Sequence, residues 1–330
     1  MGMAEKLRIG MISSAHVHAH SYVVVLRDNP IFEFIGVWDD DVERGLEFSK
    51  NYGVRFFKDL NELLEEVEAV VIVSENVKHL EHVEMTAGKV KAILCEKPIA
   101  VNVETAEKML KICAERKTKI GTAFPVRYSP VVQSMRQVLE SGRIGNVLMI
   151  ISTNRGKVPP GWFTDPELAG GGAMMDHIVH VVDLLRWIFK REFERVRAFV
   201  GDNINEELEV EDNAMLYLEL GDIPVTLDCS WSKPKSYPYW GDVTFRFIGS
   251  EGVMEVDVFR QTMTRYDNME RKIEWLYYGS NIDEALLVDF AKRVLRDEEL
   301  FITGEDGLEA TRVVEKAYES ARLGKVVNLR

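Results

Sequence analysis

Hydrophobic positions follow two different patterns along the chain, and the change falls near residue 122. Before it, short runs that are apolar throughout alternate with segments whose apolar residues recur at helical spacing. The predicted strands are 7–12, 32–38, 69–73 and 91–95, and the predicted helices are 18–27, 41–51, 60–66, 77–88 and 103–116. Asp41 can cap the second of these helices, and Gly53 follows it as a C-terminal stop. Strands that are apolar on both faces and alternate with helices predict a parallel sheet covered on both sides.

The second pattern begins with a helix at 131–140 and continues as strands joined by turns such as Gly221-Asp222. The predicted strands are 146–153, 194–200, 213–220, 223–231, 242–248 and 253–259, and two helices follow at 283–297 and 306–322. Consecutive strands with short turns predict a largely antiparallel, open sheet. We therefore expect a Rossmann-type, doubly wound α/β domain at 1–122 and an α+β domain at 123–330.

Composition and charge narrow the class of partner. The 330 residues are 46% hydrophobic and carry a formal net charge of −13, which argues against binding nucleic acid or anionic membranes through a broad surface field. No apolar run approaches the roughly 18 residues that span a bilayer, and the N-terminus lacks the apolar core of a signal peptide. We expect a cytoplasmic protein whose partners are small molecules and copies of itself.

The residues that follow the predicted parallel strands are the first candidates for a site, because ligands of such sheets bind outside the carboxyl ends of the strands. After the first strand, Ser13, Ala15 and His18 stand where a dinucleotide fold carries the three glycines of G-x-G-x-x-G. A tight turn into a helix N-terminus is still possible there. We expect Ser13, Ser14 and His16 to hold phosphates by side chains, beside the small Ala15.

Two further strand ends carry charged groups. Asp39 ends the second strand 26 positions after Ser13, near the spacing at which an acid binds the adenosine ribose, although helix capping is the alternative role. Its neighbour is Asp40 rather than an arginine, so NAD is favoured over NADP. Lys97 ends the fourth strand and faces the ligand crevice, and Pro98 restricts it to extended geometry.

A glycine-rich helix start is the strongest candidate in the second domain. Gly170-Gly171-Gly172 interrupts the chain, and an apolar helix then runs from Met174 to Trp187. Asp176, His180 and Asp183 fall at i, i+4 and i+7 on one face of that helix. Burying these groups is costly unless they pair with each other or with a ligand, so the helix is either a capped structural element or part of an active site.

Together these motifs resemble the glucose-fructose oxidoreductase and inositol dehydrogenase family of NAD(P)-dependent oxidoreductases over nearly the whole chain. Glu96-Lys97-Pro98, followed at family spacing by the glycines and the Asp176/His180 helix, carries the resemblance. Ser74-Glu75-Asn76-Val77-Lys78-His79 stands where the family has T-P-N-x-x-H, and Arg127-Tyr128-Ser129-Pro130 matches its R-[FY]-[ST]-P. The glycine fingerprint is missing, and Glu75 replaces a proline.

The resemblance implies roles for individual residues. It makes Lys97 and His180 catalytic and gives Asp176 a part in holding the substrate. It adds Ser74, Asn76, His79 and Glu96, together with Lys97 itself, to the expected cofactor site, and Arg127, Tyr128 and His177 to the expected substrate site. Trp162 lies in a Pro/aromatic loop that suits a sugar ring face, although packing under the loop is an equal alternative.

Histidines 16, 18 and 20 form a His-x-His-x-His loop of the kind that can hold a metal. We predict no metal site, on the ground that no Asp, Glu or Cys at ligand spacing accompanies the loop.

The predicted function is an NAD-dependent dehydrogenase acting on a secondary hydroxyl of a sugar, sugar acid or cyclitol, with His180 as base and Asp183 orienting it. The alternatives are a non-catalytic sugar or nucleotide sensor, and hydrolase or lyase chemistry with retained NAD. The resemblance also implies a homodimer or homotetramer.

Overall fold

The computed structural model describes residues 5–330, which form two compact units. The first unit comprises the chain up to Pro125 with Asp165–Gly170 and Asp283–Arg312, and the second comprises Val126–Thr164, Gly171–Ile282 and Val313–Arg330. The chain thus returns to the first unit twice after Pro125. The division into domains at 1–122 and 123–330 stays a prediction.

The first unit contains a six-stranded parallel sheet with strand order β3-β2-β1-β4-β5-β6. Its strands are β1 (Leu7–Ile12), β2 (Phe32–Trp38), β3 (Phe56–Phe57), β4 (Ala69–Ile72), β5 (Ala92–Cys95) and β6 (Lys119–Thr122). All residues of β4 and β5 are buried, as expected for strands covered on both faces. The order is that of a doubly wound dinucleotide-binding fold, so the predicted class is confirmed.

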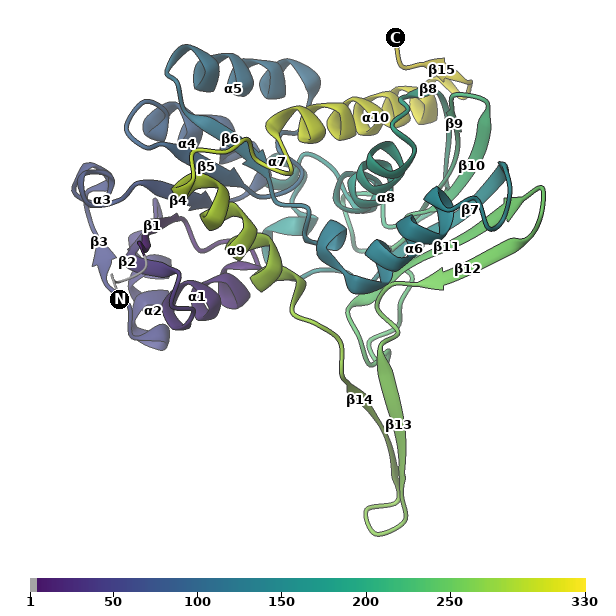
Figure 1. The fold of residues 1–330 in the computed structure, drawn as a ribbon, viewed down its shortest axis with the longest axis horizontal. Coiled ribbons are helices and arrows are strands. Elements are labelled where there is room, and N and C mark those ends of the chain that lie inside the picture. Colours follow the sequence, from purple (N-terminus) through teal and green to yellow (C-terminus); the bar gives the residue numbers. More distant parts are fainter. Residues whose placement is uncertain (1–4) are drawn as a thin grey trace. The chain divides into compact units, whose positions relative to one another are not determined.

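Helices cover both faces of this sheet, with α4 and α5 on one side and α1 and α2 on the other (Figure 1). The helices are α1 (Ala19–Asp28), α2 (Val42–Tyr52), α3 (Leu60–Glu66), η1 (Asn76–Lys78), α4 (His79–Thr86), α5 (Val103–Glu115), α7 (Pro166–Ala169) and α9 (Ile282–Leu295). Asp41 caps α2 through the amides of Glu43 and Arg44, and Gly53 ends it with φ +65°. Both signals had been predicted from the sequence.

The second unit is built on a seven-stranded sheet with order β12-β11-β7-β10-β9-β8-β15. Its strands are β7 (Val147–Gly156), β8 (Phe193–Val200), β9 (Ala214–Leu220), β10 (Ile223–Asp228), β11 (Gly241–Gly249), β12 (Val253–Asp257) and β15 (Val327–Asn328). Only the β7–β10 pair is parallel among these described strands, so the sheet is largely antiparallel as predicted. Burial alternates along β9 and β10, so one face of the sheet is packed and the other is open.

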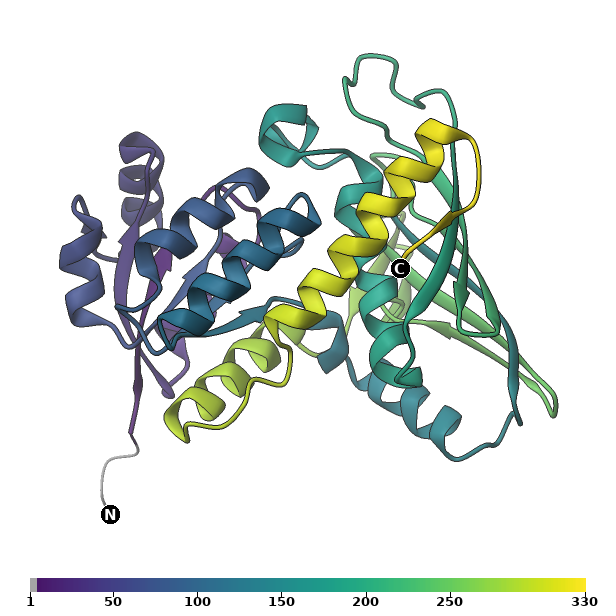
Figure 2. The same cartoon turned by 90° about the horizontal axis from the view of Figure 1, so that it is seen from above.

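The helices of the second unit lie on the packed face of the sheet (Figure 2). They are α6 (Pro130–Glu140), α8 (Ala173–Phe189) and the part of α10 (Gly304–Leu323) from Val313 onward, with short 3-10 turns η2 (Pro125–Tyr128) and η3 (Gly161–Thr164). A separate hairpin, β13 (Thr262–Asp267) with β14 (Lys272–Tyr277), projects from this unit (Figure 1). None of the described helices is long and apolar enough to span a membrane.

Some element bounds differ from the predicted ones for local reasons. The predicted strand 223–231 ends at Asp228, because the Asp228 carboxylate accepts from the Ser230 amide and hydroxyl and so turns the chain. The predicted helix 77–88 is a 3-10 turn followed by α4, which ends at Thr86. The hairpin β13–β14 was not predicted, although β13 alternates polar and apolar residues as a strand does, and the structure leaves most of its side chains exposed.

Candidate active site

The first unit brings four predicted strand ends to one edge of its sheet. Parallel pairing aligns Ile12 with Trp38 and Ile72, and Ile72 with Cys95. The residues that follow these strands therefore leave the sheet on the same side. They are the turn from Ser13 to His18, Asp39, the segment from Ser74 to His79, and Glu96 with Lys97.

The turn after β1 has the backbone of a glycine turn without the glycine. Ser13 is buried and adopts a left-handed φ of +65°. Its hydroxyl accepts from the amide of Ala15 (3.3 Å) and from Nη2 of Arg44 (3.2 Å), which helps to hold this conformation. No side chain among the described residues caps the first turn of α1, so this helix N-terminus fits an anionic group such as a dinucleotide phosphate.

Ser14 and Asp39 are bonded to each other. Asp39 Oδ2 accepts from the amide (2.8 Å) and the hydroxyl (2.6 Å) of Ser14, so the hydroxyl that we expected to meet a phosphate already has a partner. Asp39 Oδ1 also accepts from the amide of Asp41 (3.0 Å). Asp39 is therefore fixed at the end of β2, where its predicted role as a ribose ligand remains a prediction.

Arg44, which the sequence analysis missed, lies beside Asp39. Its Nη2 donates to Asp39 Oδ1 (2.6 Å) and its Nη1 to Glu75 Oε1 (2.9 Å), while Lys78 Nζ donates to Asp40 Oδ2 (2.5 Å). Three carboxylates thus share two cations at this edge. A signal was present in the sequence, because the Asp41 cap starts α2 at residue 42 and places Arg44 in its first turn.

The residues matched to T-P-N-x-x-H serve the backbone around the site. His79 is buried, with Nδ1 3.1 Å from the carbonyl of Pro98 and Nε2 3.3 Å from that of Ser74. Burial lowers the pKa of His79, so the ring is neutral and donates to one of these carbonyls at a time. Asn76 Nδ2 donates to the carbonyl of Ala169 (2.9 Å), and Ser74 Oγ lies 2.9 Å from His82 Nδ1. Their predicted contacts with the cofactor are additional to these bonds.

Glu96 is fully buried and joins the histidine loop. His18 Nδ1 donates to Glu96 Oε1 (3.1 Å), and His16 Nε2 lies 3.9 Å from Oε2. The premise that no acid accompanies this loop was therefore wrong, because parallel pairing carries the end of β5 to the end of β1 through β4. Nitrogen and oxygen atoms of the three side chains lie within 4.8 Å of one another. His20 points elsewhere, with Nδ1 2.8 Å from the hydroxyl of Tyr52.

Hydrogen bonds from the His18 amide and the His18 ring hold the two histidines and Glu96 together. His16 Nδ1 accepts from the amide of His18 (3.1 Å), so the proton of a neutral His16 ring is on Nε2, the atom that faces Glu96. A metal on Nε2 would require that proton to move to a nitrogen already receiving one. Lys97 follows directly, with its side chain buried and its amide donating to Glu96 Oε2 (3.1 Å).

Three glycines precede α8, Gly170 at the end of a first-unit segment and Gly171 and Gly172 in the second unit, and each has its own steric reason. Gly170 has φ +76°, which favours glycine. A Cβ on Gly171 would overlap the hydroxyl of Tyr318, and one on Gly172 would overlap the carbonyl of Glu211. Glu211 caps the helix, because its carboxylate accepts from the amides of Gly172 (3.1 Å) and Met174 (2.9 Å).

Helix α8 is buried from Ala173 to Leu185, so its polar groups require partners. Trp231 Nε1 donates to Asp176 Oδ2 (3.3 Å), and His177 Nε2 lies 3.2 Å from the same oxygen. The His177 ring is itself buried and makes edge contacts with Trp231 and Trp240. The structure therefore gives His177 a role in supporting Asp176, and its contact with substrate stays a prediction.

His180 lies one turn beyond Asp176 and is also buried. One turn further, Asp183 accepts two bonds from Arg127, from Nε (2.9 Å) and Nη2 (2.5 Å). Both partners are almost fully buried, so Arg127 neutralises Asp183 inside the unit. Tyr128 and Trp162 are partly exposed, and the Trp162 ring stacks on Phe163 with centroids 4.0 Å apart.

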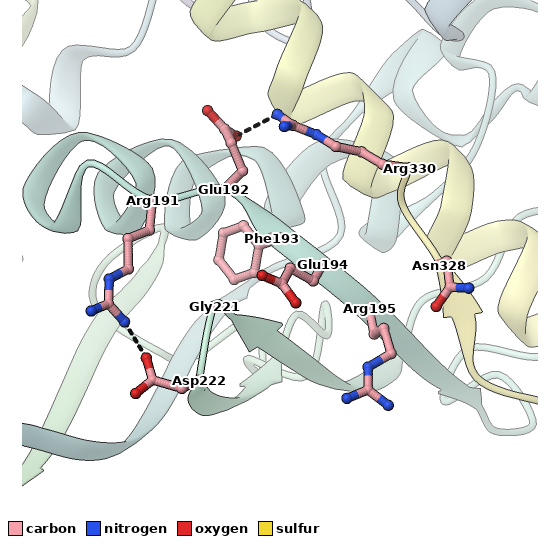
Figure 3. A pocket seen from close by; sticks show the side chains of 9 residues that line it. All are labelled: Arg191, Glu192, Phe193, Glu194, Arg195, Gly221, Asp222, Asn328 and Arg330. Carbon is pink, nitrogen blue, oxygen red and sulfur yellow. Dashed lines mark hydrogen bonds and ion pairs between the residues drawn. The ribbon is translucent and has the colours of Figure 1, made fainter.

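One cavity of about 740 Å³ in the second unit, at the ends of β8, β10 and β15, is lined by none of these residues. Figure 3 shows its charged lining, in which Arg191 pairs with Asp222 and Arg330 with Glu192. Arg195, which also lines it, pairs with Glu219 (2.6 Å). Because its arginines are neutralised within the wall, we assign no ligand to this cavity.

The first unit has a doubly wound sheet, an uncapped α1 N-terminus, acids at its strand ends and Lys97 after β5. The second unit contributes the helix with Asp176 and His180. Together these features are typical of dinucleotide-dependent oxidoreductases. Comparison with known proteins gives the family. Residues 7–124 match the model "Oxidoreductase family, NAD-binding Rossmann fold", and residues 132–255 match the "GFO/IDH/MocA C-terminal domain". The chain belongs to the GFO/IDH/MocA family and is an NAD(P)-dependent dehydrogenase.

Relatives cover much or all of the chain at moderate identity. Myo-inositol 2-dehydrogenase of Thermotoga maritima is 27% identical over 98% of both chains. Glucose-6-phosphate 3-dehydrogenase of Bacillus subtilis is 28% identical over 64% of each chain. Among solved structures, a probable dehydrogenase from Thermotoga maritima has a TM-score of 0.84 and 25% identity, and covers 98% of this chain and 99% of its own. The predicted family is thereby confirmed.

Proposed function

We propose that this protein is an NAD-dependent dehydrogenase that oxidises a secondary hydroxyl of a sugar, sugar acid or cyclitol. The observation that carries the proposal is the set of groups retained on the family's framework. Lys97 lies two residues after the end of β5, and Asp176 and His180 lie on one face of α8 with Asp176 bonded to Trp231. Relatives named as inositol, xylose and glucose 6-phosphate dehydrogenases support the substrate class.

Each group has a definite part in the proposed reaction. His180 accepts the proton of the substrate hydroxyl as hydride leaves the same carbon. The bound dinucleotide supplies the chemistry of hydride acceptance through its nicotinamide ring. Lys97 donates to the substrate oxygen and stabilises its developing charge. Asp176 accepts from a neighbouring substrate hydroxyl, and the hydrogen bond from Trp231, with the His177 ring packed 3.2 Å from the same oxygen, fixes the carboxylate for that purpose.

The charges at the end of β2 support NAD over NADP. Asp39, Asp40 and Glu75 together outnumber Arg44 and Lys78, so a 2′-phosphate would enter an edge with excess negative charge. Arg44 weakens this preference, because it neutralises part of that charge.

The three buried cysteines form no disulfide among the residues described, which supports the expected cytoplasmic residence.

A substrate screen with matched variants tests the function. Purified protein is mixed with NAD or NADP and a panel of polyols, sugars and sugar acids, and cofactor reduction is followed by absorbance. On the best substrate, Lys97→Ala and His180→Ala should each lower turnover by about a hundredfold or more with unchanged melting temperature. Lys91→Ala, at the opposite end of β5, and His20→Ala are the controls and should retain activity. Wild-type turnover in both site variants would refute the assigned roles.

A further inference from the structure

His18 stands where the dinucleotide fingerprint has its third glycine, at the N-cap of α1. Instead of leaving room for close packing, its ring extends to the end of β5, where Nδ1 donates to Glu96 Oε1 (3.1 Å). The side chain remains 29% exposed, whereas Glu96 is fully buried. The cluster therefore has one face towards solvent, and His18 forms that face.

Glu96 requires a positive partner because a buried carboxylate without one is very costly. Burial alone raises the pKa of Glu96, but the charge of His18 and its hydrogen bond to Glu96 lower it, and the net effect is a pKa well below its usual range. Glu96 is therefore ionised. Nδ1 of His16 accepts a hydrogen bond from the amide of His18, so that nitrogen carries no proton and the ring is neutral. The cation that balances Glu96 is accordingly His18.

The groups around His18 favour its charged form. Burial lowers the pKa of His18, Glu96 at the end of β5 and Asp283 in the first turn of α9 raise it, and Lys97 lowers it. The net effect is a raised pKa. Asp283 itself accepts from the hydroxyl of Ser21 on α1 (2.6 Å), and the pKa of Tyr22 is raised by burial and by Glu96, so Tyr22 stays neutral.

We propose that His18, oriented by Glu96, acts as an imidazolium that binds the diphosphate of the dinucleotide at the N-terminus of α1. Nδ1 is used by Glu96, and within residues 5–330 no hydrogen bond occupies Nε2, which leaves that N–H for a phosphate oxygen. The imidazolium replaces the bare amides that glycines would expose at this turn. This inference rests on the proposed function, since it presumes that the first unit binds NAD.

The proposal makes the affinity for NAD depend on pH in one direction. The diphosphate is anionic throughout the neutral range, so binding favours the protonated ring and weakens as pH rises through the pKa of His18. Loss of one charge-assisted hydrogen bond should lower affinity by about tenfold to a hundredfold in total. Dissociation constants are measured by calorimetry between pH 6 and pH 9 with NAD, ADP-ribose and adenosine.

Three proteins make the comparison decisive. Wild type should lose affinity for NAD and ADP-ribose as pH rises, but show no such loss for adenosine, which has no phosphate. His18→Gln should bind NAD and ADP-ribose weakly, and its affinity for them should depend little on pH. The control His20→Gln should behave like wild type. If His18→Gln does not fold, the wild-type profiles still decide the question. Melting curves at each pH establish that the protein is folded.

Different failures have different meanings. Absence of NAD binding to wild type at every pH would refute the proposed function itself. Tight NAD binding that is independent of pH and of His18 would overturn this inference alone. Stoichiometric zinc binding that requires His18 and competes with NAD would also overturn it, because the cluster would then be a metal site.

Discussion

At the scale of single residues, Asp39 at the end of β2 is hydrogen-bonded and partly neutralised by Arg44. Asp39 was predicted to bind the ribose, but the structure adds Arg44, which bonds to Asp39, Glu75 and Ser13 at once. We predict that Asp39→Ala narrows the preference for NAD over NADP by about 1–2 kcal/mol, because it removes a ribose acceptor and a charge that repels the 2′-phosphate. Binding of both cofactors is measured by calorimetry.

Arg44→Ala should change the preference for NAD over NADP in the opposite direction from Asp39→Ala. Removing the guanidinium leaves the carboxylates of Asp39 and Glu75 less neutralised, so NADP should bind even more weakly relative to NAD. Arg55→Ala is a suitable control, because Arg55 is an exposed residue paired with Glu66. If wild type prefers NADP, or if both variants shift the preference in the same direction, this account of the ribose edge is wrong.

At the scale of elements, the N-terminus of α8 depends on one partly buried carboxylate. Glu211 accepts from two helix amides and from the hydroxyl of Tyr318 (2.7 Å). Burial raises the pKa of Glu211 even though these bonds lower it. Because the folded-state pKa is raised, the stability that Glu211 contributes is fully present below its unfolded pKa of about 4.5 and decreases as pH rises through the folded-state value.

Removing the cap should therefore be measurable in two ways. Glu211→Ala should lower the free energy of unfolding by about 1–2 kcal/mol, as loss of a helix cap does. Glu211→Gln keeps acceptors for the amides but cannot ionise, so its stability should lack the decrease that wild type shows between pH 4 and pH 8. Denaturant unfolding at several pH values makes the comparison. Parallel curves for wild type and Glu211→Gln would contradict this role.

The same scale shows what the sequence could and could not predict. Periodicity predicted both sheets, and the Asp41 cap and Gly53 stop were read correctly because each is a local signal. The cap of α8 comes from Glu211, 35 residues after Asp176, and the partner of the histidine loop comes from β5. Such contacts depend on strand order, which local patterns do not encode. Ser13 adopts the φ of the missing glycine, so a glycine-free loop still made the expected turn.

At the scale of the whole molecule, the open face of the seven-stranded sheet exposes apolar side chains that indicate an association surface. Phe199 and Met215 are paired across β8 and β9 and are 57% and 58% exposed, and Met149 and Ile151 of β7 add further apolar area. Exposed apolar patches of this kind mark association surfaces. We infer a homodimer or homotetramer formed through this face, which is the assembly that the family resemblance implies.

The last prediction tests that surface. Met215→Glu places a charge on this face, where association would bury the carboxylate without a partner, so the protein should dissociate to a smaller species. Sedimentation velocity of wild type and variant at equal concentration gives the result. Val42→Glu is the control, because Val42 is an exposed apolar residue of α2 in the first unit. A wild type that sediments as a monomer, or a Met215→Glu protein that keeps the wild-type assembly, would show that this face is not the interface.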